Sequence, residues 1–190
     1  MCREEDALLL INKTHPLAPG WEESVKRIPV TSVRGLSIEV EETTLAAWLD
    51  LKSDMAARGM TIGILSAYRS REEQVHTIER LTKEFGPEYA AATAAPVGAS
   101  EHHTGLCLDI TMQEGGAWVI GNMNLMAAEE SYLKIHERLA EHGFILRYPR
   151  GKETITGYGY EPWHIRYVGK KAAKEITDSG ITLEEYLRQE

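Results

Sequence analysis

The chain has 190 residues, of which 43% are hydrophobic and 26% charged, and its formal net charge is −8 at pH 7. These proportions are typical of a globular protein, and the length suits one domain over residues 1–190 rather than two. The chain is acidic and contains no block of Lys or Arg. We therefore expect neither nucleic acid nor an anionic membrane surface as its partner.

Apolar runs in the sequence are short. None approaches the ~20 residues that a membrane-spanning helix needs, and charged residues at positions 3–6 occupy the place of a signal peptide's apolar core. The chain has two cysteines, Cys2 and Cys107, and we expect no structural disulfide between them. These features predict a cytoplasmic protein without a membrane span.

Hydrophobic runs and alternation predict short strands, in chain order, at residues 8–11, 30–33, 36–40, 60–65, 106–112, 144–148 and 163–168. Helical periodicity predicts helices at residues 43–58, 70–85, 88–95 and 125–142, followed by two closing helices. Two of these predicted helices begin with a capping box. In this motif the side chain of the cap residue hydrogen-bonds to the backbone N–H three residues later, and the Glu at that later position hydrogen-bonds to the backbone N–H of the cap residue. The pairs are Ser70 with Glu73 and Thr182 with Glu185.

Two stretches carry further predictions. In the helix predicted at residues 70–85, Val75, Ile78, Leu81 and Phe85 supply an apolar stripe. Residues 113–124 contain three glycines around a tryptophan, which predicts a mobile flap with an aromatic tip rather than regular structure.

The segment 100–109 contains two metal-binding side chains seven residues apart, His102 and Asp109. That spacing does not fit a helical site, where ligands fall four residues apart, but it fits a loop followed by a strand. Within the strand, Leu106, Leu108 and Ile110 should point one way, and Cys107 and Asp109 the other. Asp109 is therefore predicted on the site face.

A catalytic zinc site keeps about three protein ligands and one open position, and His102, Asp109 and His164 supply such a set. Zinc lowers the pKa of a bound water from ~15.7 to about 7, and a nearby carboxylate must still accept the proton. Glu161, three residues before His164, is the candidate base. Arg69, at a strand-to-helix junction, offers a fixed positive charge for an oxyanion.

Each of these residues also has an ordinary interpretation when taken alone. A histidine is often solvated or satisfied in the core, Glu161 can be a solvent-facing turn residue, and Arg69 can be a surface residue at a helix start. The remaining histidines are interpreted in that ordinary way: His15, His76, His103, His136 and His142. The case for a site rests on the clusters occurring together.

Three motifs occur in order along the chain: Ser66-x-Tyr68-Arg69 with Gln74, Ser100-x-His102-x-x-Gly105-x-Cys107-x-Asp109, and Glu161-x-Trp163-His164-x-Arg166. Together they resemble the zinc D,D-peptidases of the VanY and VanXY type, which are D-alanyl-D-alanine carboxypeptidases of the LAS group. Each motif alone is weak, but the three in this order are specific. The resemblance extends along most of the chain.

The resemblance implies an α+β fold of the LAS type (hedgehog/D-Ala-D-Ala peptidase-like), a single domain with a small central antiparallel sheet flanked by helices. It implies one Zn²⁺ on His102, Asp109 and His164, with Glu161 as base and Arg69 stabilising the transition state. The resemblance also implies that the substrate would be bound by Ser100, Gln74 and Tyr68. The family usually has alanine at the position of Cys107, which is interpreted as a small buried residue, or as a thiol whose oxidation crowds the metal.

The expected activity is hydrolysis of D-Ala-D-Ala, as the free dipeptide, at the end of a peptidoglycan precursor stem, or both. Such an activity would remove the targets of glycopeptide antibiotics, so a role in resistance is predicted. One alternative is a zinc-stabilised module that binds peptide or cell-wall fragments without cleaving them, although binding alone needs neither Glu161 nor Arg69. Another is hydrolysis of an L,D-linkage by the same fold.

Overall fold

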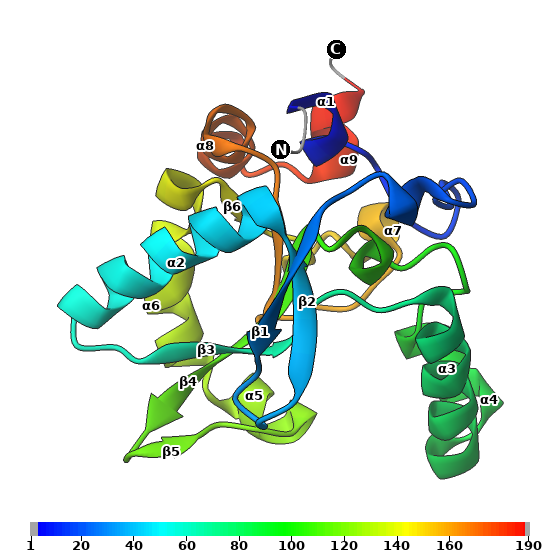
Figure 1. The fold of residues 1–190 in the computed structure, drawn as a ribbon, viewed down its shortest axis with the longest axis horizontal. Helices are drawn as coiled ribbons and strands as arrows, with labels where there is room; N and C mark the ends of the chain where they lie inside the picture. The colour runs from blue at the N-terminus through cyan, green and yellow to red at the C-terminus, as the bar shows by residue number, and fades with distance from the viewer. Residues whose placement is uncertain (1–3, 189–190) are drawn as a thin grey trace.

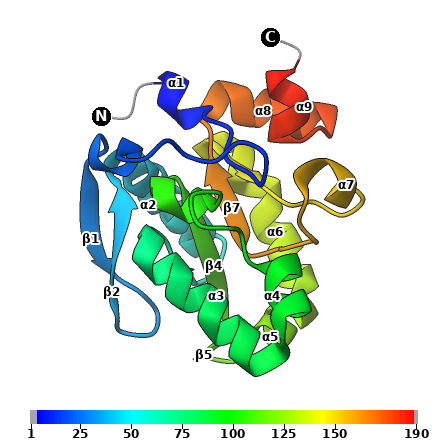
Figure 2. The ribbon, with the colours of Figure 1, turned by 90° about the vertical axis from the view of Figure 1, so that its right-hand side faces the viewer.

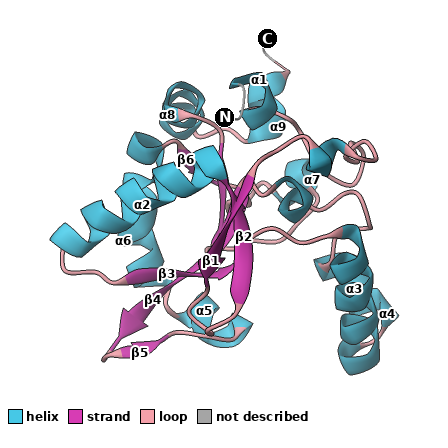
Figure 3. Ribbon diagram, viewed as in Figure 1, coloured by secondary structure: helices cyan, strands magenta, loops and turns pink. Residues whose placement is uncertain are grey.

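An antiparallel sheet of five strands lies at the centre of the molecule, as a computed structural model describing residues 4–188 shows (Figure 1). Four strands follow the order β3 (Ile62–Ser66), β4 (Cys107–Glu114), β7 (His164–Tyr167) and β6 (Phe144–Leu146), and β5 (Ala117–Trp118) pairs with the end of β4. Helices flank this sheet on the ribbon coloured by secondary structure (Figure 3). The α+β prediction is confirmed.

One face of the sheet is covered by α2 (Glu42–Ala57) and α6 (Glu129–Leu139), and the main hydrophobic core lies between these layers. The core side chains of α2 recur at helical spacing, whereas those of β4 alternate along the strand. Its members include Trp48, Leu51 and Met55 from α2, Tyr132 and Ile135 from α6, and Leu108, Ile110 and Ile165 from the sheet. The alternating apolar residues of the strands and the helically spaced apolar residues of α2 and α6 therefore pack into one core.

A two-stranded hairpin precedes α2. It consists of β1 (Arg27–Thr31) and β2 (Ser37–Glu41), which pair antiparallel from Arg27 opposite Glu41 to Thr31 opposite Ser37. The turn between the strands includes Gly35 at a φ of 76°, a conformation that favours glycine. The predicted hairpin is confirmed, with its strands shifted by a few residues.

A second hydrophobic cluster joins the two ends of the chain. It includes side chains of β6, α8 (Lys170–Ser179) and α9 (Leu183–Leu187), with Leu8 and Leu10 packed against it. Figure 2 shows α1 (Glu4–Ala7) at the same end of the molecule as α8 and α9. The strand predicted at residues 8–11 is wrong, because the carbonyl of Leu9 accepts a hydrogen bond from the Arg166 guanidinium instead of from a neighbouring strand.

The helices α3 (Arg71–Phe85) and α4 (Pro87–Thr93) form a pair that projects from the rest of the fold (Figures 1 and 2). The capping box of Ser70 and Glu73 is present, as predicted. The apolar stripe of α3 is largely outside the core, since Val75 is 39% and Phe85 59% exposed. Gln74 is the buried residue of this helix.

The glycine-rich segment after β4 is regular rather than a flap. Gly115 and Gly116, with φ of 59° and 84°, turn the chain so that β5 pairs back on β4. Trp118 lies over Gly63, where an added Cβ would come within 2.8 Å of the indole ring. The predicted aromatic tip therefore packs against β3, and α5 (Asn122–Ala127) follows it.

The helix predicted at residues 125–142 is divided among α5, α6 and the 3-10 helix η3 (Ala140–His142). The remaining short helices are α7 (Glu153–Thr156) and the 3-10 turns η1 (Trp21–Glu23) and η2 (Glu101–Thr104). The second closing helix, α9, begins with the predicted capping box of Thr182 and Glu185. Across the described residues, every helix is too short or too polar to span a lipid bilayer.

Candidate active site

Asp109 and His164 come together through strand pairing. Asp109 on β4 lies directly opposite His164 on β7, and opposed residues of antiparallel strands project from the same face. Their neighbours Leu108 and Ile165 project to the other face and enter the main core. The predicted alternation along β4 is confirmed, with Asp109 on the face away from the core.

His102 reaches the same point from the turn η2, which lies immediately before β4. Gly105 ends this turn in the left-handed conformation, with a φ of 71°, and its N–H donates to the carbonyl of His102. An added Cβ at Gly105 would lie 3.2 Å from the backbone nitrogen of Glu41. Both the backbone conformation and the space therefore favour glycine.

The imidazole rings of His102 and His164 each have two neighbours. One ring nitrogen faces Asp109, and the other, which we call the outer nitrogen, lies next to a hydrogen-bond acceptor on the far side of the ring. The Nδ1 of His102 donates to the carbonyl of Ala67, and the Nε2 of His164 lies 3.3 Å from a carboxylate oxygen of Glu101. These partners place the ring protons on the outer nitrogens. The inner nitrogens then present lone pairs toward a carboxylate, an arrangement that a cation between them would satisfy.

The distances among these inner atoms fit a zinc ion. His102 Nε2 lies 3.4 Å from Asp109 Oδ2, and His164 Nδ1 lies 3.2 Å from Asp109 Oδ1. Two ligand atoms bound at 2.0–2.1 Å to one tetrahedral zinc are separated by roughly 3.4 Å. The three predicted ligands therefore have the donor chemistry of a zinc site, and both histidine–carboxylate separations match that spacing.

The electrostatics of the cluster favour positive charge. Burial opposes protonation of His102, but Cys107 and Asp109 raise its pKa to about 9. Burial likewise opposes ionisation of Asp109, yet His102 and His164 hold the pKa of its carboxyl well below the ordinary range. A site that holds positive charge in this way is suited to a divalent cation.

Glu161 lies beside the three candidate ligands. Its Oε2 is 3.8 Å from His164 Nδ1, and its side chain is 26% exposed. Burial raises the pKa of Glu161 to about 7, which is near the optimum for a general base at neutral pH. Two hydrogen bonds hold the backbone of this loop: the Glu161 N–H donates to Tyr148 O, and the His136 side chain donates from Nε2 to Pro162 O.

A cavity of about 440 Å³ opens onto this cluster. Its lining includes all the predicted site residues except Tyr68: Arg69, Gln74, Ser100, His102, Asp109, Glu161 and His164. The Tyr68 ring instead packs beneath the Arg27 guanidinium, 4.0 Å from centroid to carbon. The structure therefore brings seven of the eight predicted residues together and leaves Tyr68 outside the cavity.

Gln74 holds Arg69 in place within this cavity. Its Oε1 accepts a hydrogen bond of 2.9 Å from Arg69 NH1, and its Nε2 donates to Ala95 O at 2.7 Å. The backbone of Arg69 is fixed as well, because its N–H donates to His102 O and its carbonyl accepts from His103 Nδ1. This geometry favours a positioning role for Gln74, acting through Arg69, over direct contact with the substrate.

Sequence reasoning missed a buried ion network behind His164. The fully buried Glu101 accepts hydrogen bonds of 2.7 Å from both Arg147 and Arg166, and Arg147 also pairs with Glu184. Burial opposes ionisation of Glu101, but the two guanidinium groups hold the pKa of its carboxyl well below the usual range. The sequence did contain a sign of this network: Arg147 and Arg166 each occur within a predicted apolar strand. A buried arginine needs an acidic partner, so such a position predicts a buried carboxylate nearby.

Aromatic side chains of the cavity were also not predicted. The Tyr148 ring lies 4.8 Å from the His164 ring and 4.9 Å from that of Tyr158, and both tyrosines line the cavity. Trp163 both lines the cavity and packs against the main core. These rings narrow the cavity around His164 and limit its contact with water.

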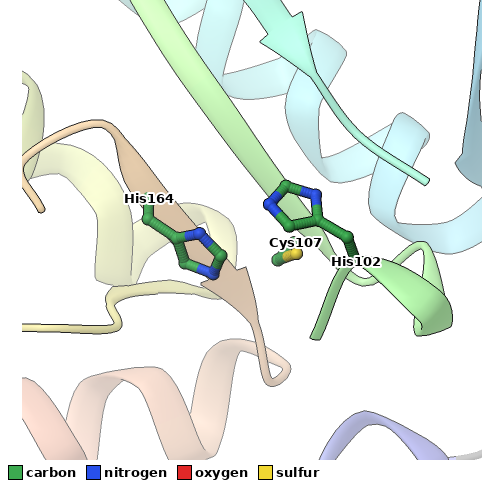
Figure 4. Close-up of side chains that lie close together, drawn as sticks. All are labelled: His102, Cys107 and His164. Atoms are coloured by element: carbon green, nitrogen blue, oxygen red, sulfur yellow. The ribbon is translucent and has the colours of Figure 1, made fainter. Parts of the chain in front are cut away.

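Cys107 is also close to the candidate ligands. Its sulfur and one nitrogen each of His102 and His164 all lie within 4.8 Å of one another. Figure 4 shows the thiol between the two imidazole rings. The sequence placed Cys107 on this face by alternation, but only the fold shows how near it lies to both histidines.

A family model and several known proteins match most of this chain. The VanY family model, described as D-alanyl-D-alanine carboxypeptidase, matches residues 37–170. The chain belongs to the VanY family. The resemblance inferred from the three sequence motifs is thereby confirmed, as is the assignment to a family of zinc metallopeptidases.

Known proteins resemble the chain over nearly its full length. The bifunctional D-Ala-D-Ala dipeptidase and D-Ala-D-Ala carboxypeptidase VanXYC of Enterococcus gallinarum is 34% identical over 185 residues, which are 95% of this chain and 93% of that protein. The crystal structure of the VanY E175A mutant from a VanB-type resistance cassette, in complex with Zn(II), has a TM-score of 0.80 at 29% identity and covers 95% of this chain and 98% of its own.

A third comparison concerns the LdcB LD-carboxypeptidase, whose structure has a TM-score of 0.83 at 34% identity and covers 97% of this chain and 87% of its own. Zinc is therefore the cofactor expected in this family, and the histidine and carboxylate atoms described above fit it.

Proposed function

We propose that this VanY-family chain is a zinc-dependent D,D-peptidase that hydrolyses the D-Ala-D-Ala bond, in the free dipeptide, at the end of a peptidoglycan precursor stem, or both. The observation that carries the proposal is the placement of Glu161 beside three zinc-binding side chains, with Arg69 in the same cavity. A non-catalytic binding module needs neither of these two residues in such a position. We therefore favour hydrolysis over binding alone.

The proposed ligands are His102, Asp109 and His164. When bound there, Zn²⁺ supplies Lewis acidity toward a carbonyl oxygen and lowers the pKa of water. Glu161 accepts the proton of the attacking water and then delivers it to the departing amine nitrogen. Arg69 stabilises the negative charge that develops on the carbonyl oxygen, and its fixed position minimises reorganisation during the reaction.

Substrate binding is proposed to use the polar groups of the cavity wall. Ser100 is 5% exposed and lines the cavity, so its hydroxyl can bond a terminal D-residue. Gln74 keeps the Arg69 guanidinium directed into the cavity, as its two hydrogen bonds indicate. A cavity of about 440 Å³ lies within the size range of small-molecule sites, which supports a short peptide as substrate.

The second candidate function is hydrolysis of an L,D-linkage, in which the residue before the scissile bond is an L-amino acid. It is favoured by the similarity to the LD-carboxypeptidase LdcB, whose TM-score and identity are as high as those of the D,D-peptidase relatives. Both reactions release a terminal D-Ala from the same type of zinc site. They differ in which chirality the cavity accepts on the other side of the scissile bond.

The test is a D-Ala release assay on three substrates: D-Ala-D-Ala, a stem pentapeptide ending in D-Ala-D-Ala, and a stem tetrapeptide ending in an L,D-bond. We expect turnover of the dipeptide or the pentapeptide, loss of activity with a chelator and recovery with zinc. Cleavage of the tetrapeptide alone would replace the D,D-assignment by the L,D-one. Failure on all three with zinc bound would favour the binding module.

A role in glycopeptide resistance and a cytoplasmic location accompany this proposal. Removal of D-Ala-D-Ala termini takes away the structure that glycopeptides bind, so expression of the chain in a susceptible host should raise its tolerance. The location stays a prediction, which cell fractionation of the native host would test.

A further inference from the structure

Cys107 lies on the inner side of the candidate zinc site. It is a free cysteine with no exposed surface, and it is not among the residues that line the cavity. On β4 it projects from the same face as Asp109, one pleat repeat earlier. The thiol is thus the sheet-side neighbour of the two imidazoles, as Figure 4 shows.

The geometry brings the sulfur within reach of a shared ion. The Cys107 sulfur and one nitrogen each of His102 and His164 lie within 4.8 Å of one another. Ligand atoms bound to one tetrahedral zinc, with sulfur at 2.3 Å and nitrogen at about 2.0 Å, are separated by roughly 3.5 Å. Because 4.8 Å is an upper limit on the three separations, the sulfur and the two nitrogens surround a common point.

A second observation points to a metal at this place. His102 and His164 are only 5% and 4% exposed, and their inner nitrogens have the Asp109 carboxylate as their hydrogen-bonding neighbour. Acceptors that face one another in a buried site need a shared cation or proton. The thiol is therefore next to a site that already requires positive charge, and is not an isolated cysteine.

We propose that Cys107 is a fourth protein ligand of the zinc ion, bound through its sulfur from the side opposite the cavity. The inference rests on the metal site of the proposed function and adds a ligand to it. On binding, the metal–sulfur bond forms and the thiol proton passes to solvent. A soft thiolate in the ligand set favours zinc over hard cations such as Mg²⁺.

Four protein ligands distinguish this site from an open site with three. The carboxylate and imidazole ligands border the cavity, so the substrate side of the ion stays accessible while the thiolate occupies the inner side. Catalytic zinc can expand to five-coordination during reaction. Cys107 thus strengthens metal binding without closing the cavity.

X-ray absorption of the zinc-loaded wild-type protein tests the proposal directly. We expect one sulfur scatterer at about 2.3 Å from zinc, together with nitrogen and oxygen scatterers at about 2.0–2.2 Å. The cobalt-substituted protein should show a near-ultraviolet thiolate-to-cobalt charge-transfer band beside its visible bands. Both measurements use the intact chain and do not depend on turnover.

Two variants identify the sulfur. Cys2→Ser removes the chain's other cysteine and should keep the sulfur shell and the charge-transfer band, whereas Cys107→Ala should lose both. We expect zinc affinity in Cys107→Ala to fall by roughly 10- to 100-fold, since even loss of an outer-shell partner costs that much. Unchanged affinity in that variant would refute a ligand role for the thiol.

The outcomes separate this inference from the proposed function. Stoichiometric zinc or cobalt with no sulfur signal in the wild type overturns the Cys107 ligand but leaves the site of His102, Asp109 and His164 intact. A signal that disappears in Cys2→Ser overturns it as well. Failure of the wild type to bind either metal overturns both the inference and the metal-dependent function.

Discussion

Glu101 is predicted to hold His164 in its metal-binding orientation, and Glu101→Gln tests that role. The substitution keeps the shape of the side chain but removes the charge that Arg147 and Arg166 share. It also weakens the acceptor that faces His164 Nε2 at 3.3 Å. We therefore expect two separate losses, one in stability and one in zinc affinity.

The size of each loss follows from the burial of the network. Removing one partner of a buried ion pair costs about 3–5 kcal/mol. For a chain of this length, that corresponds to a decrease in Tm on the order of 6–20 °C. Zinc affinity should fall by roughly 10- to 100-fold, the usual cost of losing an outer-shell partner of a ligating histidine.

Glu184→Gln is the matched control for this prediction. Glu184 is as buried as Glu101 and pairs with the same Arg147, but its carboxylate accepts hydrogen bonds from Arg147 and Asn12 rather than facing His164. Thermal unfolding and zinc competition against a chelator are measured for both variants. Glu184→Gln should lose stability and keep its zinc affinity. An equal loss of affinity in the two variants, or none in Glu101→Gln, would show that Glu101 does not position His164.

Three further predictions concern the base, the oxyanion charge and pH. Glu161→Gln should lower kcat by about 10²- to 10⁴-fold with zinc still bound, measured by D-Ala release and metal content; full activity would exclude Glu161 as the base. Arg69→Lys should lower kcat by about 10²- to 10³-fold, since a point charge held elsewhere cannot replace the fixed guanidinium, and a change in KM alone would contradict the oxyanion role. The hydrogen bond from Arg138 lowers the pKa of Asp54. Its contribution to stability is fully present above the unfolded pKa of about 3.9 and is lost as the pH falls through the lower folded pKa. Asp54→Asn should therefore unfold at a lower temperature than wild type at pH 7, with the gap shrinking toward pH 3; a constant gap would refute this.

Local features of the fold were predictable because they depend on neighbouring residues. The capping boxes at Ser70 and Thr182 each involve residues three positions apart, so they form wherever the helix forms. The alternation along β4 follows from the period of a strand, which placed Cys107 and Asp109 on one face before any partner strand was known.

The location of apolar side chains was mispredicted where those side chains could pack against more than one part of the fold. The stripe on α3 has true helical spacing, yet Val75 and Phe85 stay exposed because α3 pairs with α4 away from the main core. Trp118 was predicted at the tip of a mobile flap because its glycine neighbours allow many backbone conformations. The indole instead packs over Gly63, whose missing side chain could not be connected to Trp118 from the sequence.

The residue types of the site follow from the amino-acid sequence: two histidines, one aspartate and one glutamate in motifs that carry the family resemblance, with Asp109 placed on its face by strand alternation. The fold was needed to show that Asp109 pairs with His164, 55 residues away, and that Glu101 lies behind His164 between two arginines. The physical reason is that strand register and buried charge pairing depend on contacts distant in the chain, whereas caps and alternation depend on adjacent residues.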